Sequence, residues 1–239
     1  MGDNSISLSD DKDEKKNAAV QGFIRVVIRV RPLVDNERLG TWEVGPCHMA
    51  DKAPLKDRQK PYQFEKIFGQ ATNNGQIYSE VVCDMVQAAV SAYNCTIFAY
   101  GQTGSGKTHT ILGNQDDPGI MLRAFCDLFS KIDSTQDRVF CVRVAYIELY
   151  NEELYDLLSE KPMDRMGDRG LLKIVETPTR GLAVHGLREV DMSTPEQMMQ
   201  VLEEGQRQRM VRSPAAGHAS FFMPNCTLLE PLRVAEGKP

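Results

Sequence analysis

The sequence has 239 residues, 41% hydrophobic and 26% charged, which is enough for one α/β domain or a little more. Its net charge of −5 argues against a general nucleic-acid binder, and no apolar run is long enough to cross a bilayer, so we expect neither nucleic acid nor membrane as a partner. The six cysteines form no C-x-x-C pair and lie mostly within apolar runs. We therefore predict reduced, buried thiols in a cytosolic protein, without disulfides or a metal site.

The N-terminal region is polar before the first strand begins. Residues 1–20 form a charge-rich lead with too little apolar surface to fold alone, and they lack the features of a secretory signal. Residues 23–30 alternate as a strand does, and Pro32 ends that pattern. Residues 35–61 are polar with scattered glycine and proline, which indicates a loop or small hairpins.

The next stretch reads as short strand, helix, strand and glycine-rich loop. Residues 62–68 predict a short strand, and Asn73 and Asn74 offer caps for a helix whose apolar residues recur at helical spacing up to residue 89. Residues 95–100 are apolar, β-branched and aromatic, as in a strand. This order indicates a crossover unit, and hence an α/β fold with a central, mostly parallel sheet flanked by helices.

Residues 101–108 read GQTGSGKT, which matches the phosphate-loop pattern G-x-x-x-x-G-K-T. Glycines allow successive N–H groups to converge on a phosphate, and a helix beginning near Lys107 would add its unpaired N–H groups and dipole. Lys107 would contact the β- and γ-phosphates, and the Thr108 hydroxyl would ligate Mg²⁺. An ordinary glycine-rich turn is the alternative. We predict that ATP and Mg²⁺ bind at Gly101, Gln102, Thr103, Gly104, Ser105, Gly106, Lys107 and Thr108.

The second half of the chain continues with alternating elements. Hydrophobic periodicity and turn residues predict a turn at 116–119, a helix over 121–132, a strand over 139–147, and short strands around 171–175 and 183–190. Thr194 is a helix cap followed by proline at the first helical position, and this last helix should run to about Arg209.

Four stretches together resemble the kinesin motor domain. They read IRVRPL from residue 28, TIFAYGQTGSGKTHT from residue 96 and ELYNEELYDLL from residue 148, with a fourth match over 181–211. The resemblance covers about residues 23–211 and implies a partial kinesin-like motor domain over 21–211, with ATPase activity of the kinesin type. It does not assign a subfamily.

The resemblance also implies contacts outside the phosphate loop. Arg29 and Pro32 would pack against the adenine, with His109 near the base, although Arg29 also fits the solvated side of a strand and His109 a plain surface position. Residues 148–158 would be mainly structural, with their charges on a solvated face. Tubulin would be touched by Arg180, His185 and Arg188.

The chain departs from the family after Val211. The first switch motif, N-x-x-S-S-R-S-H, should follow, but residues 212–220 read RSPAAGHAS, and no D-L-A-G-S-E second switch occurs in the printed sequence. We therefore predict a C-terminally incomplete fold, an irregular tail over 212–239, no assignable catalytic residue, and ATP binding with little turnover. Microtubule binding would be weakened by the missing half.

Three interpretations follow. In the first, the chain is a truncated copy of an ATP-driven microtubule motor, located in the cytoplasm on the microtubule cytoskeleton. In the second, it is a short nucleotide- or tubulin-binding module without motor activity. The third, a phosphate-loop NTPase outside the kinesins, is disfavoured by the motifs that flank the loop. Oligomeric state, direction of movement and cargo are not predicted.

Overall fold

The computed structural model describes residues 24–34, 37, 40, 42–51, 61–136, 138–150, 152–159, 171–177, 181–212 and 221–228. The chain divides into two compact units, Met1–Ala71 and Thr72–Pro239. The predicted single domain over 21–211 stays a prediction, and the two units are described separately below.

The first unit contains two small sheets. Strand β1 (Val27–Arg29) pairs in parallel with β5 (Lys66–Phe68), and the carboxyl end of β5 carries the buried Ile67 and Phe68. Strands β2 (Trp42–Val44), β3 (His48–Asp51) and β4 (Tyr62–Gln63) form an antiparallel sheet where a loop or small hairpins were predicted. The strand predicted over 23–30 is shorter than expected.

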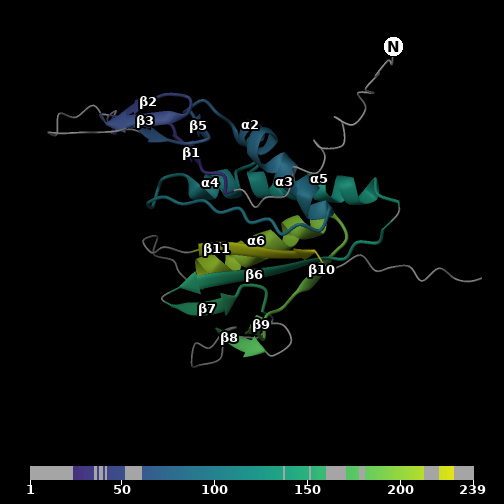
Figure 1. The fold of residues 1–239 in the computed structure, drawn as a ribbon. Helices are drawn as coiled ribbons and strands as arrows, with labels where there is room; N and C mark the ends of the chain where they lie inside the picture. The colour runs from purple at the N-terminus through teal and green to yellow at the C-terminus, as the bar shows by residue number, and fades with distance from the viewer. Residues whose placement is uncertain are drawn as a thin grey trace, which may run out of the picture. The chain divides into compact units, whose positions relative to one another are not determined.

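The second unit begins with a helical layer (Figure 1). Helix α2 (Asn74–Ile77), the π-helical turn η1 (Tyr78–Val82) and α3 (Cys83–Val90) follow one another without a break. The Asn73 side chain caps α2 in a capping box with Gln76. Apolar residues of η1 and α3 pack against α5 (Ile120–Asp133), whose stripe includes the buried Phe125 and Phe129. Both predicted helices in this layer are confirmed.

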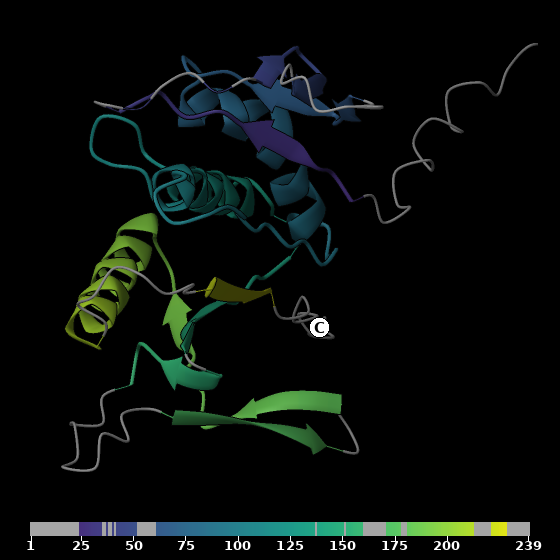
Figure 2. The same cartoon turned by 90° about the vertical axis from the view of Figure 1, so that its left-hand side faces the viewer.

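The second unit also contains a six-stranded sheet, in which β6 (Val142–Tyr150) pairs with three other strands (Figures 1 and 2). Strand β11 (Phe221–Leu228) pairs with β6 along one edge, and β10 (Val190–Met192) and β7 (Glu153–Asp156) share the other. Strands β8 (Leu171–Thr177) and β9 (Gly181–His185) form a ribbon that extends the sheet beyond β7.

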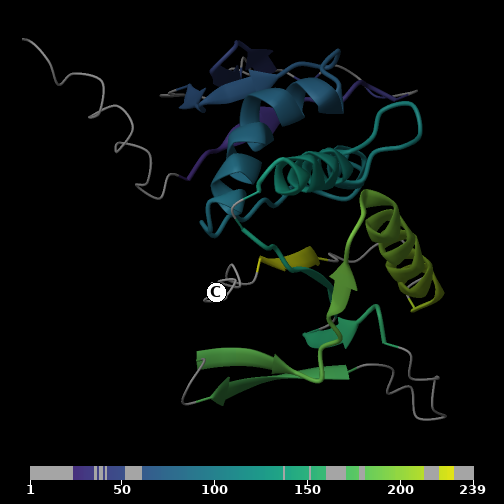
Figure 3. The same ribbon diagram turned by 90° about the vertical axis from the view of Figure 1, so that its right-hand side faces the viewer.

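Helix α6 (Pro195–Arg212) packs against β6 and β10 (Figure 3). Thr194 caps its first turn, as predicted, because the Gln197 N–H donates to Thr194 Oγ1. The Gln197 side chain completes the cap by accepting the Ser193 N–H at Oε1. Gly205 allows the close approach to β6: a Cβ at this position would lie 2.1 Å from Cδ1 of the fully buried Tyr146. The helix and the sheet therefore share a tightly packed contact.

Three predictions about strands are wrong. The mixed α/β class holds, but in the described part of the chain β1 and β5 form the one parallel ladder, and the ladders around β6 are antiparallel. The tail is not wholly irregular, because β11 pairs with β6 over eight residues. Residues 95–100 form no strand, since no described strand pairs with them.

The thiols are less buried than predicted. Cys47, Cys95 and Cys126 are exposed, and these three, together with Cys83 and Cys141, are free thiols. Apolar neighbours in the sequence did not bury them, because burial depends on which segments pack over a residue. None of the helices in the described ranges combines the length and the apolar character that a membrane span needs.

Candidate functional site

The predicted phosphate loop is a turn built on backbone conformations that favour glycine. Gly104 and Gly106 have φ angles of 79° and 96°. At Gly101 an added Cβ would lie 2.5 Å from Ser105 Oγ, so a side chain there would collide with the loop itself. The Ser105 N–H donates to the Gln102 carbonyl oxygen at 3.1 Å and closes the turn. These contacts make the loop a compact backbone turn.

Lys107 folds back over this loop from the first residue of α4 (Lys107–Ile111). Its Nζ donates to the carbonyl oxygens of Gly101 at 2.8 Å and Gln102 at 2.9 Å. The helix begins at Lys107 as predicted but has only five residues, so its dipole contributes less than that of a long helix. The positive charge above the loop is therefore supplied mainly by the Lys107 ammonium group.

Two further predicted site residues lie on the exposed side of α4. Thr108 and His109 are both exposed, so each side chain can be reached from solvent. A threonine hydroxyl beside a phosphate-binding loop suits Mg²⁺, which takes one or two protein oxygens together with phosphate oxygens and water. The residues present therefore fit a magnesium nucleotide.

The residues predicted to contact adenine belong to the other unit. Arg29 is the last residue of β1 and is partly buried, and Pro32 is exposed three residues later. Both precede the boundary at Ala71, whereas the phosphate loop follows it. Their role in binding adenine stays a prediction.

A residue that no sequence motif assigned to the site, Asn74, contacts the end of α4, and Asp117 holds that residue in turn. Asn74, treated above only as a helix cap, donates through Nδ2 to the carbonyl oxygens of His109 and Asp117, each at 3.0 Å. The carboxylate of Asp117 in turn accepts the Asn74 N–H at 2.9 Å. The sequence did offer one signal for this role of Asn74. Asn73 already caps the helix, and a second asparagine inside a helix is unfavourable, which indicates that Asn74 has another function.

The charges of residues 148–158 were predicted to lie on a solvated face, and this prediction is wrong for two of them. Glu148 is 2% exposed and Asp156 is 4% exposed. The Asp156 carboxylate accepts the Leu158 N–H at 2.8 Å and the Arg188 N–H at 3.0 Å, which satisfies a buried charge. The expected structural role fits these contacts, because two backbone N–H groups compensate the buried carboxylate of Asp156.

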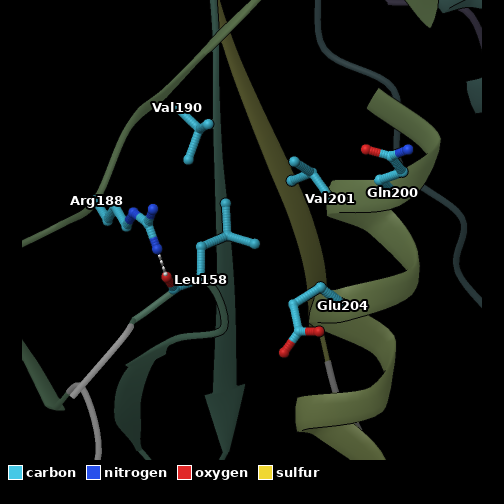
Figure 4. Close-up of a pocket in the computed structure, with 6 residues that line it drawn as sticks. All are labelled: Leu158, Arg188, Val190, Gln200, Val201 and Glu204. Atoms are coloured by element: carbon cyan, nitrogen blue, oxygen red, sulfur yellow. Dashed lines mark hydrogen bonds between the residues drawn. The ribbon is translucent and has the colours of Figure 1, made fainter. Parts of the chain in front are cut away.

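Arg188 was predicted as a tubulin contact and is also part of the packing beside α6. Its Nη1 donates to the Leu158 carbonyl oxygen at 2.8 Å. Figure 4 shows this bond at the edge of a pocket of about 220 Å³, which Val190 and three α6 residues complete: Gln200, Val201 and Glu204. Arg188 therefore ties the segment after β7 to the segment before β10.

The other predicted tubulin contacts concern the β8–β9 ribbon. His185 is exposed at the end of β9, opposite Lys173 in the ladder, so both basic residues lie on the ribbon. Arg180 lies outside the described residues. Tubulin contact by this ribbon stays a prediction.

Comparison with known proteins gives a consistent result. The Kinesin family model, described as the kinesin motor domain, matches residues 29–220. The predicted resemblance over about residues 23–211 is therefore confirmed, and the match extends to residue 220, past Val211. The described strand β11 begins directly after that match.

Curated relatives include two kinesin-like proteins. The chain is 36% identical over 190 residues to kinesin-like protein KIN-7N of Arabidopsis thaliana, covering 78% of this chain and 22% of the relative. It is 35% identical over 232 residues to kinesin-like protein KIF11-B of Xenopus laevis, covering 88% of this chain and 21% of the relative. The chain thus spans about a fifth of the length of these relatives.

A solved structure agrees with the sequence comparisons. It contains KIF14 residues 391–772 as a dimer in a two-heads-bound state with AMP-PNP, in complex with a microtubule. The superposition has a TM-score of 0.72 at 26% identity and covers 80% of this chain and 55% of that chain. On the matched family model, the relatives and this fold, the chain belongs to the kinesin motor domain family.

Proposed function

We propose that this chain binds ATP with Mg²⁺ through residues 101–108 and derives from the ATP-driven microtubule motors of its family. The observation that carries the proposal is the position of Lys107, whose Nζ donates to the carbonyl oxygens of Gly101 and Gln102 in the loop. The N–H groups of Gly104 and Gly106 have no acceptor among the described residues. They are thus available to phosphate oxygens.

Each part of the loop has a distinct role in this proposal. The backbone N–H groups hold the phosphate chain, and Lys107 contacts the β- and γ-phosphates as a point charge. Thr108 would hold Mg²⁺, which neutralises charge on the phosphates when bound. His109, Arg29 and Pro32 would surround the adenine. The remaining loop residues shape the turn: Gln102, Thr103 and Ser105.

We expect the 239-residue chain to turn ATP over slowly. Phosphoryl transfer depends on a positioned water and on groups that stabilise charge as it develops, and the loop alone supplies only binding and part of that charge. Neither switch motif of the family is written in the printed sequence. A binding module for nucleotide or tubulin without motor activity is the alternative.

Microtubules are the proposed partner, and the cytoplasmic cytoskeleton the proposed location. The KIF14 structure contains a microtubule, which supports this partner by family membership. On this chain the β8–β9 ribbon presents Lys173 and His185 at one rung of the ladder, and these basic residues would suit an acidic partner surface. We expect weak binding, because two basic residues supply little attraction at physiological salt.

Two measurements test these proposals. Calorimetric titration with ATP and Mg²⁺ should show one site per chain, and a folded protein that binds no nucleotide at millimolar concentration would refute the assignment of the loop. Co-sedimentation with microtubules and phosphate release with and without microtubules separate the alternatives. Rapid turnover without microtubule stimulation would instead favour an NTPase that does not act as a motor.

A further inference from the structure

Asn74 lies where the helical layer meets the end of the phosphate-loop helix. Its side chain is fully buried, with 0% exposure. The two Nδ2 hydrogens serve two carbonyl oxygens from different segments, His109 in α4 and Asp117 in the turn after α4. A single buried amide thus joins α2 to both.

The carbonyl oxygen of His109 needs such a partner because α4 is short. Near the end of the helix, Thr108 O accepts the N–H of Leu112 at 2.8 Å and that of Gly113 at 3.3 Å. A continuing α-helix would direct the Gly113 N–H to His109 O instead. The His109 carbonyl oxygen, which lacks this helical bond, accepts a hydrogen bond from Asn74 Nδ2 instead.

The second carbonyl belongs to a turn that is itself firmly held. Gly113 has φ 73°, and a Cβ there would lie 2.2 Å from Gly119 N, so the chain reverses with no room for a side chain. Asp117 donates its N–H to Asn114 Oδ1 at 2.7 Å, and Arg123 of α5 donates through Nε to the Pro118 oxygen at 2.9 Å. Asn74 therefore holds α4 against a fixed part of the unit.

We propose that Asn74 is a positioning residue for the nucleotide site. By fixing the His109 carbonyl, it sets the orientation of the short helix that carries Lys107 and Thr108, and so the position of the ammonium group over the loop. Asn74 contacts no nucleotide in this proposal. The inference rests on the proposed binding of ATP at residues 101–108.

The test compares Asn74→Ala with Asn73→Ala in the full chain. Asn73 caps the same helix, and its side chain bonds to Gln76 N rather than to α4, so its loss destabilises α2 without releasing the His109 carbonyl. We expect Asn74→Ala to weaken binding of magnesium ATP about tenfold, and Asn73→Ala to change it less than about twofold. Equal weakening in both variants, or none in Asn74→Ala, would overturn the proposal.

Amide hydrogen exchange in the protein without nucleotide provides an independent readout. Asn74→Ala should accelerate exchange at the Thr110 and Leu112 amides, which bond within α4, and Asn73→Ala should leave them unchanged. If the wild type binds no ATP, the proposed function fails, yet this exchange result still decides whether Asn74 fixes α4. Unchanged exchange in Asn74→Ala would refute that role.

A milder variant covers the case in which Asn74→Ala does not fold. Asn74→Ser keeps one hydrogen-bond donor and removes the other. Its amide exchange rates in α4 and its affinity for magnesium ATP should therefore lie between those of the wild type and those expected when both donors are lost. Wild-type values in both measurements would refute the proposal.

Discussion

Removal of the Lys107 ammonium group should abolish most nucleotide affinity. In the structure Nζ lies 2.8 and 2.9 Å from two loop carbonyl oxygens, within reach of a phosphate held by the same loop. A unit charge about 4 Å from a phosphate charge contributes about 4 kcal/mol at an effective dielectric constant of about 20. That energy corresponds to roughly 10³-fold in affinity, and some of it is offset by desolvation of the ammonium group. We expect the Kd for magnesium ATP to rise between about 10² and 10³-fold in Lys107→Ala.

Calorimetric titration of wild type and variant measures this change. Lys131→Ala is the matched control, because Lys131 lies on α5 and pairs with Asp127 at 3.5 Å instead of facing the loop. Its removal should leave the Kd unchanged. If a folded Lys107→Ala protein bound ATP within about threefold of the wild type, the charge of Lys107 would not act on the phosphates, and the assignment of the site would be wrong.

Three further predictions concern stability and the tail. Gly205→Ala should lower the free energy of unfolding by about 1–3 kcal/mol in urea titrations despite the better helix propensity of alanine, because the new Cβ would collide with the Tyr146 ring. Burial and a hydrogen bond to Asp127 raise the pKa of Tyr78, so the folded state favours the neutral phenol. Stability should be full below pH about 10 and fall as the pH rises further, with a smaller fall in Tyr78→Phe. Amide exchange in β11 should be slow at alternate residues, because the strand bonds to β6 along one edge.

Each of these predictions has a control or an opposing outcome. Glu203→Ala changes an exposed position of α6 and should leave the unfolding midpoint within the error, so a similar loss there would remove the clash as the explanation. Tyr93→Phe alters an exposed tyrosine and should not reduce the alkaline fall. Rapid exchange throughout Phe221–Leu228 would show that the tail is irregular, as the sequence had suggested.

Local signals in the sequence predicted the helices well. The cap at Asn73, the apolar stripe of α5 and the Thr194 capping residue are determined by neighbours within one or two turns, and the structure has all three helices. The glycines of the phosphate loop are equally local, because the φ angles at Gly104 and Gly106 depend on a short segment. These features need no knowledge of the rest of the fold.

Features that depend on distant partners were not predictable in the same way. Residues 95–100 have strand-like composition, but a strand exists only where another strand pairs with it. The tail lacks a clear period, yet β6 offers it an edge and it pairs there. The buried Asp156 accepts the N–H of Arg188, which is 32 positions away, and Asn74 contacts residues 35 and 43 positions away. Contacts between residues so far apart leave no pattern in a single sequence.

The exposed aromatic residues between α3 and the phosphate loop have a practical consequence. Phe98 is 81% exposed and Tyr100 is 92% exposed, in a segment without regular secondary structure. A protease that cleaves after aromatic residues should therefore cut here early, since extended accessible backbone is what such enzymes accept. Because α3 packs against α5 across this point, the two fragments should stay associated in native buffer and separate only on a denaturing gel. Limited digestion would thus yield a nicked protein in which the phosphate loop lies at or near a new N-terminus and is no longer covalently joined to α3.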